Sequence, residues 1–203
     1  MSTADRILDA AMLAYGGRGY DATSLDDLAA DLGIRKQSIL YHFPSKDQLL
    51  DAAVDRAVGE LTQVLWDVIA TSDDGFDRVE AMVRGVFRLA MRRPELLGLL
   101  REVTRLGPPV LNRATDALDP LIKGATEWLR AEMAEGRVRK SDPQLLAFSV
   151  YSTVMGVATE IEVLRAVGVE PSAREAALRR RELLRFLRSA LQPAADAGEE
   201  LRS

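Results

Sequence analysis

Apolar residues recur at intervals of three and four along nearly the whole chain, which is the spacing of one face of an α-helix. No segment alternates apolar and polar residues as a half-buried strand does, so we expect an all-α fold. Glycine and proline interrupt the pattern and mark where one predicted helix ends and the next begins. The predicted helices cover residues 3–15, 25–32, 35–42, 46–70, 76–92, 95–105, 109–135, 143–167 and 172–191.

The three short helices at the N-terminus contrast with the longer helices that follow them. We therefore expect a small helical head over residues 1–45 and a larger helical body over residues 46–192. A flexible tail is predicted for residues 193–203, because the last helical pattern has ended before Pro193 and chain ends are often poorly ordered.

Residues 25–44 fit the packing needs of a helix-turn-helix. Ala29 is small at the point where two helices would cross, and Gly33 permits the left-handed turn between them. The outward positions of the second helix, residues 35–42, carry cations, hydroxyls and an amide, a mixture suited to phosphates and base edges. The alternative is an ordinary solvated helix with a satisfied histidine. The apolar seam between the two helices is assigned to Leu28, Leu32, Ile34 and Ile39.

The composition and the distribution of charge bear on how the predicted helix-turn-helix would bind DNA. The chain has 203 residues, of which 47% are hydrophobic and 29% charged, with a net charge of −4, as in a folded water-soluble protein. Residues 1–50 carry seven aspartates against five lysines and arginines, a net charge of −2. A net positive charge is confined to residues 35–46, which hold three of these five cations, the one histidine and no carboxylate. We therefore expect weak non-specific affinity for DNA.

The remaining composition bears on location and chemistry. Cysteine is absent, which excludes disulfides and thiolate metal sites and fits a reducing compartment. The N-terminus lacks the basic and apolar regions of a signal peptide. The longest uncharged run, residues 143–159, is slightly too short to span a membrane and contains polar side chains. We expect a cytoplasmic protein with no membrane segment, no metal and no cofactor.

The head also resembles the N-terminal domain of TetR-type (TetR/AcrR) transcriptional regulators in both residue types and spacing. The resemblance is detailed over residues 5–50; beyond them only the size, the helical layout and the stretch RRPELLGLL at residues 92–100 are similar. The matching positions are Tyr15, Gly19, Tyr20, Thr23, Ser24, Leu25, Leu28, Ala29, Leu32, Gly33, Ile34, Ile39, Tyr41, His42, Phe43, Ser45, Lys46, Leu49 and Leu50.

The resemblance implies a homodimeric repressor that binds a palindromic operator in double-stranded DNA and leaves it when a small apolar effector binds the body. The candidate DNA-binding residues are Thr23, Ser24, Arg35, Lys36, Gln37, Ser38, Tyr41, His42 and Lys46. Gln37 and Ser38 stand where base contacts are common in the family. The phosphate-contacting positions are Thr23, Tyr41, His42 and Lys46.

Two positions depart from the family pattern. Leu40 stands where an aromatic residue usually touches the DNA, so that contact is lost or replaced. Arg35 stands where a serine or threonine usually caps the recognition helix, and it exchanges a good cap for a phosphate contact.

The predicted helix over residues 143–167 is apolar on nearly every side, so other surfaces must cover most of it. In one alternative, a single subunit covers this helix alone. We favour the other, in which one face of the helix lines the interior and another face packs against a second subunit. The six arginines of residues 172–191 then lie on a solvated or dimer-rim face rather than on nucleic acid. In the family, the last two helices of each subunit form a four-helix dimer interface, and a two-fold dimer matches a palindromic operator.

Aromatic and methionine side chains of the body are candidates to line an apolar ligand cavity, an assignment that rests mostly on the resemblance. Residues of these types at helical spacing also fit an ordinary core. The candidates are Trp66, Phe87, Met91, Trp128, Phe148, Tyr151 and Met155, with Arg101, Arg105, Glu160 and Glu162 as candidate polar anchors.

Two other functions compete with this one. Enzymatic activity is not expected, because the chain has no cysteine and no glycine-rich phosphate loop, and its histidine is assigned to DNA. The second rival is a ligand-binding or interaction dimer that has lost specific DNA binding, for which Leu40 is the one supporting feature.

Overall fold

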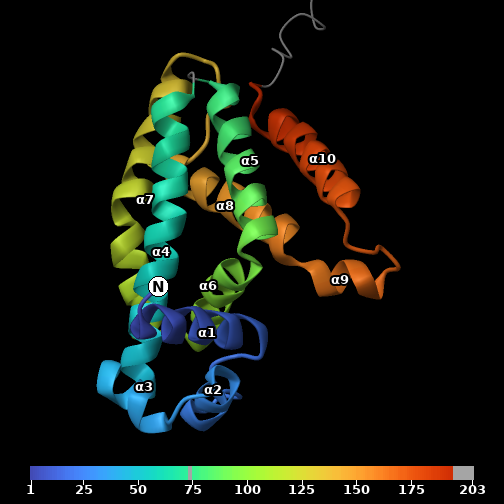
Figure 1. Cartoon of the computed structure of the whole chain (residues 1–203). Coiled ribbons are helices and arrows are strands. Elements are labelled where there is room, and N and C mark those ends of the chain that lie inside the picture. The colour runs from blue at the N-terminus through green and yellow to red at the C-terminus, as the bar shows by residue number, and fades with distance from the viewer. Residues whose placement is uncertain (73–74, 194–203) are drawn as a thin grey trace, which may run out of the picture. The chain divides into compact units, whose positions relative to one another are not determined.

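The structure is a computed structural model that describes residues 1–72 and 75–193, and every regular element in this part of the chain is a helix (Figure 1). The predicted all-α class is confirmed. Residues 194–203 of the predicted flexible tail lie outside the described residues. The helices are α1 (Thr3–Gly17), α2 (Leu25–Leu32), α3 (Lys36–His42), α4 (Lys46–Thr71), α5 (Phe76–Arg92), α6 (Pro94–Leu106), α7 (Val110–Ala134), α8 (Pro143–Thr159), α9 (Ile161–Ala166) and α10 (Ala173–Leu191).

The prediction of one continuous helix over residues 143–167 is wrong, because the structure has two helices there. Between α8 and α9 the backbone of Glu160 leaves the helical region, with φ −77° and ψ 53°. No glycine or proline stands at this break. Thr159, Ile161 and Val163 around it are β-branched, and such residues lose side-chain freedom in a helix. A prediction based only on the spacing of apolar residues does not take this low helix propensity into account.

The chain packs into two compact units. Unit 1 comprises Met1–Trp66 and Arg88–Asp119, and unit 2 comprises Asp67–Phe87 and Pro120–Ser203. Unit 1 is larger than the predicted head of residues 1–45, because α6 packs directly on α1. The predicted domain boundary at residue 45 therefore stays a prediction, and the compact units defined by packing do not divide at that residue.

Unit 1 is built around α1, which contacts α2, α3 and α6. Its side chains Ile7, Met12 and Tyr15 are fully buried. Two glycines let α1 and α6 approach backbone to backbone: a Cβ atom on Gly98 would lie 2.6 Å from the carbonyl oxygen of Gly16. Folded proteins do not contain contacts that short, so a larger residue at this crossing must push the helices apart.

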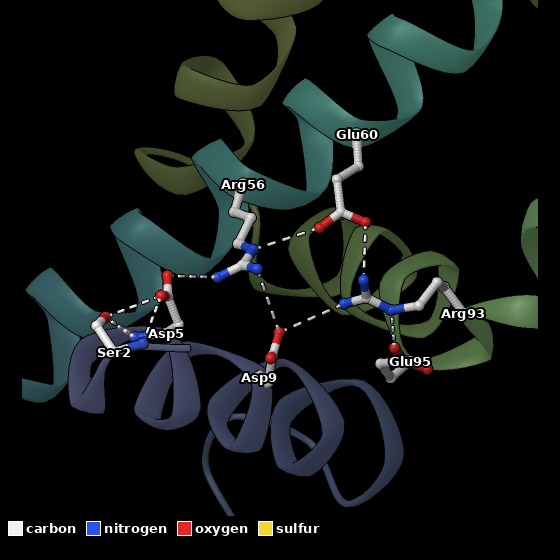
Figure 2. Close-up of polar contacts among 7 residues, drawn as sticks. All are labelled: Ser2, Asp5, Asp9, Arg56, Glu60, Arg93 and Glu95. Atoms are coloured by element: carbon white, nitrogen blue, oxygen red, sulfur yellow. Dashed lines mark hydrogen bonds and ion pairs between the residues drawn. The ribbon is translucent and has the colours of Figure 1, made fainter.

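An ionic network also joins α1 and α4 to the start of α6 (Figure 2). Two arginines share two carboxylates. Arg56 lies 3.6 Å from Asp9 and 3.3 Å from Glu60, while Arg93 lies 3.6 Å from Asp9 and 3.0 Å from Glu60. Because all four side chains are part-buried, the network ties the three helices together more firmly than isolated surface pairs would. Ser2, Asp5 and Glu95 complete the drawn cluster.

In unit 2, α8 packs against α10, and the apolar residues of α8 point in two directions. Leu146, Val154 and Met155 are buried. Other large apolar side chains of the two helices remain exposed on the single chain: Leu145, Phe148, Tyr151, Leu178 and Phe186. The alternative in which one subunit covers α8 completely therefore does not match the structure. Within the described residues, no helix has both the length and the apolar character needed to cross a membrane.

Candidate nucleic-acid interface

The helix-turn-helix predicted for residues 25–44 is present in unit 1 as α2, a short turn and α3. Gly33 adopts the left-handed conformation, with φ 65° and ψ 33°, and its N–H donates to the carbonyl groups of Ala29 and Ala30. The N–H of Ile34 also donates to the carbonyl of Ala29, at 3.0 Å. These bonds end α2 and turn the chain into α3, and glycine adopts the required conformation without a steric penalty.

An apolar seam holds the two helices together. Leu28 and Ile39 are fully buried and Ala29 is nearly so, which confirms their predicted positions. Leu32 and Ile34, assigned to the same seam, are only partly buried. Ile39 faces inward, and Lys36, Ser38 and Leu40 of α3 are partly buried, which leaves the remaining positions of the helix exposed.

The outer face of α3 carries the side chains predicted to meet DNA. Gln37, Tyr41 and His42 are exposed, and Tyr41 keeps 84% of its surface accessible. Ser38 is half-buried. The rings of Tyr41 and His42 meet edge to face with centroids 5.1 Å apart. Arg35 precedes α3 without making a side-chain cap, as its departure from the family pattern indicated.

The two hydroxyl residues before α2 differ in accessibility. Thr23 is fully buried, and its hydroxyl donates to the carbonyl of Gly19 at 2.9 Å, so the structure argues against the predicted phosphate contact. Ser24 is exposed and caps α2 through reciprocal bonds with Asp27. The Ser24 hydroxyl and N–H both donate to the Asp27 carboxylate and hold its pKa below the usual range.

Two lysines at this surface have partners that the sequence analysis did not single out. Lys36, the first residue of α3, forms an ion pair with Asp26 of α2, with 2.8 Å between Nζ and Oδ2. Lys46, the first residue of α4, lies over the ring of Tyr20, with its Nζ 4.0 Å from the centroid. A cation over an aromatic face is held electrostatically, so the orientation of Lys46 depends on Tyr20.

Tyr20 is in turn fixed by carboxylates from two helices. Its hydroxyl donates to Asp47 of α4, and its backbone N–H donates to Glu102 of α6 at 2.7 Å. Burial and the bond to Asp47 raise the pKa of the Tyr20 hydroxyl above its ordinary value. Arg105 binds both Glu102 and Asp21, at 2.7 and 2.8 Å. Arg105 thus holds the turn before α2 within unit 1.

The candidate ligand residues are divided between the two units. Trp66 and Met91 lie in unit 1 and are exposed. The members in unit 2 are Phe87 and Met155, which are buried, Trp128, which is partly buried, and Phe148 and Tyr151, which are exposed. The indole Nε1 of Trp128 is buried without a hydrogen-bond partner. Of the candidate anchors, Arg105 has the pairs described above, and the side chain of Glu162 lies outside the described residues.

Sequence comparisons point to the same domain. Residues 7–53 match the family model described as bacterial regulatory proteins, tetR family. The biofilm operon icaADBC negative transcriptional regulator IcaR of Staphylococcus aureus (strain Newman) is 36% identical over 61 residues, which is 30% of this chain and 33% of that protein. The chain thus matches about a third of the length of this curated relative.

Solved structures share the fold over nearly the whole chain. The ketosteroid transcriptional regulator KstR2 of Mycobacterium tuberculosis is 19% identical with a TM-score of 0.75, covering 94% of this chain and 95% of that one. AibR, solved with isovaleryl coenzyme A and operator DNA, is 20% identical with a TM-score of 0.76, covering 91% and 97%. By sequence, residues 7–53 therefore belong to the tetR family of bacterial regulatory proteins, and the chain as a whole shares the fold of these solved structures.

Proposed function

We propose that the protein is a DNA-binding transcriptional repressor that leaves a palindromic operator when a small apolar effector binds. The observation that carries the proposal is α3, whose exposed face offers Gln37, Tyr41 and His42 to a partner while Ile39 anchors the helix from behind. No carboxylate stands between residues 34 and 46. Such a helix suits the major groove of DNA, where an acidic helix would be repelled.

Within this helix, Gln37 reads a base and the residues one turn later position the helix. The amide of Gln37 donates and accepts at once, which matches the N7 and N6 edge of adenine, and Ser38 stands beside it. Tyr41 and His42 lie further along the exposed face and contact phosphates, as do Arg35 and Lys46.

The repressor acts as a homodimer joined through α8 and α10. The support is the exposed apolar surface of these helices, which a second copy would bury. A two-fold dimer presents two α3 helices to two half-sites, and this symmetry accounts for a palindromic operator.

The effector site is proposed in the body. In unit 2, Phe87, Trp128 and Met155 offer apolar surface, and the unpaired Nε1 of Trp128 offers one donor to a ligand. AibR binds isovaleryl coenzyme A and IcaR is a negative regulator, and both descriptions support a ligand-responsive repressor by analogy.

The test is a mobility-shift titration with DNA from upstream of the protein's own gene, with single-base variants of the bound site. Gln37→Ala should cost about 1–3 kcal/mol on the bound site and little on scrambled DNA. Tyr41→Phe should weaken both in proportion, since a phosphate contact carries no sequence information. If Gln37→Ala kept the base preference of the wild type and Tyr41→Phe changed it, the roles assigned to Gln37 and Tyr41 would be reversed.

The second candidate is a ligand-binding or interaction dimer without specific DNA binding. Leu40, in place of the usual aromatic residue, is the observation that favours it. Absence of a shifted band at low salt on every upstream fragment would support this candidate over the repressor.

A further inference from the structure

The carboxylates of α2 each hold a group that would otherwise be available to phosphate. Asp26 binds Lys36 at 2.8 Å, and Asp31 binds Arg18 at 2.9 Å. Asp27 accepts a hydrogen bond from the Ser24 hydroxyl, with 2.7 Å between the two oxygen atoms. Only the Asp26 pair reaches α3, so this aspartate alone among the three acts on the proposed recognition helix.

The Asp26–Lys36 pair contributes little to the stability of the fold. The side chains of Asp26 and Lys36 are 69% and 41% exposed, so water and salt screen the attraction between their charges. The capping of α2 does not need Asp26 either, because Asp27 forms the reciprocal bonds with Ser24. The role of the pair is therefore better explained by its effect on Lys36, which cannot contact phosphate while it is bound to Asp26.

Lys36 stands where a free ammonium group would add a phosphate contact. It opens α3, one residue before Gln37, and Arg35 precedes it. A lysine that neutralises a phosphate releases a counterion and strengthens binding to any duplex, whatever its sequence. A lysine already neutralised by a carboxylate releases none, and the carboxylate itself repels the DNA backbone.

We propose that Asp26 withholds Lys36 from the DNA backbone and so sets the sequence-independent part of DNA affinity to a low value. This inference rests on the proposed DNA binding and adds a residue to it. It also lowers the positive charge that the recognition helix offers to DNA, because the cation that opens this helix is matched by a carboxylate on the preceding helix. Discrimination between sites is left to base contacts, which Asp26 does not touch.

The test compares Asp26→Asn with Asp31→Asn in the full-length protein. Both changes remove one negative charge from an exposed position on α2, but only the first frees a cation on α3. Affinity is measured by fluorescence anisotropy over a series of KCl concentrations, on a 30-base-pair duplex of random sequence and on the bound upstream site. Thermal unfolding of each variant confirms that it folds.

Asp26→Asn should strengthen binding to both duplexes by about threefold per subunit and steepen the salt slope by about one unit per subunit. Asp31→Asn should leave the slope unchanged. In a Lys36→Gln background, Asp26→Asn should have no further effect on the slope, because its cation is gone.

Three results would overturn the inference while leaving the repressor intact: an unchanged slope in Asp26→Asn, an equal change in Asp31→Asn, or a full effect in the Lys36→Gln background. The last two would assign the effect to total charge. If neither the wild type nor Asp26→Asn bound any duplex at low salt, the proposed function would fail, and this inference with it.

Discussion

Unit 1 and unit 2 differ in how a single chain covers their apolar residues. In unit 1, α1 and α6 meet backbone to backbone, and exposed apolar side chains such as Leu13, Trp66 and Met91 lie on separate helices. In unit 2, the helices α8 and α10 pack on each other and still expose Phe148 and Phe186. The apolar side chains that unit 1 exposes are scattered, whereas unit 2 exposes apolar side chains on two helices that pack together, and the proposed dimer would bury them.

The largest expected effect is on assembly. Phe148→Asp should weaken the proposed dimer by about 2–4 kcal/mol, because it removes a large apolar contact and would bury a charge. The control is Leu13→Asp on α1, since Leu13 is 64% exposed and Phe148 is 65% exposed. Sedimentation equilibrium at micromolar concentration should show a monomer for Phe148→Asp and a dimer for the control. A monomeric wild type would remove the basis for the contrast between the units.

The second effect is on the stability of unit 1. Gly98→Ala should lower the free energy of unfolding by about 1–3 kcal/mol, because its Cβ would collide with the backbone of Gly16. Gly59→Ala is the matched control: Gly59 lies in α4 and has no atom within 4 Å of an added Cβ, so alanine should be neutral or slightly stabilising. Urea unfolding measures both, and equal midpoints would show that the crossing relaxes freely.

A smaller effect concerns the ionic network. Arg93→Met should cost about 1 kcal/mol, since Arg93 contacts the carboxylates of Asp9, Glu60 and Glu95 and is part-buried. Arg113→Met removes a more exposed arginine that forms an ion pair with Asp55, and it should cost less than half as much. Urea midpoints of the two variants are compared at low and high salt. A larger loss for Arg113→Met would contradict the network's role.

The smallest effect depends on pH. The hydrogen bond from Arg105, assisted by the Tyr20 N–H, holds the pKa of Glu102 below its unfolded value. Its stabilising contribution is therefore complete above the unfolded pKa and is lost as the pH falls through the folded pKa, from about pH 5 downward. Glu102→Gln should flatten the fall of the thermal midpoint between about pH 5 and pH 3. An unchanged acid slope would contradict the assignment.

The helix-turn-helix was predictable because its signals are local. Gly33 has to adopt the left-handed conformation, Ala29 has to be small, and Ser24 with Asp27 forms a reciprocal cap within four residues. Ser45 likewise caps the start of α4 by accepting a hydrogen bond from the N–H of Gln48. Each of these signals depends only on neighbouring residues.

The features that were not predicted from the sequence depend on its three-dimensional fold rather than on local patterns. The pairing of Lys36 with Asp26 spans ten positions and needs the turn between α2 and α3 to be in place. The burial of Thr23 follows from the path of residues 19–23, which no periodicity describes. The packing of α6 on α1 joins positions about eighty residues apart, and the resemblance of residues 92–100 to a family stretch does not say which helix they pack on.

The contact of Gly16 with Gly98 has a consequence for protein engineering. A chimera that joined residues 1–45 of this chain to the body of another regulator would carry half of a backbone crossing without its counterpart. It would also leave the N–H of Tyr20 without the carboxylate of Glu102. A graft that transfers DNA specificity should therefore take α6 along with α1 to α3, or else import a receiving helix that has a glycine at the crossing point.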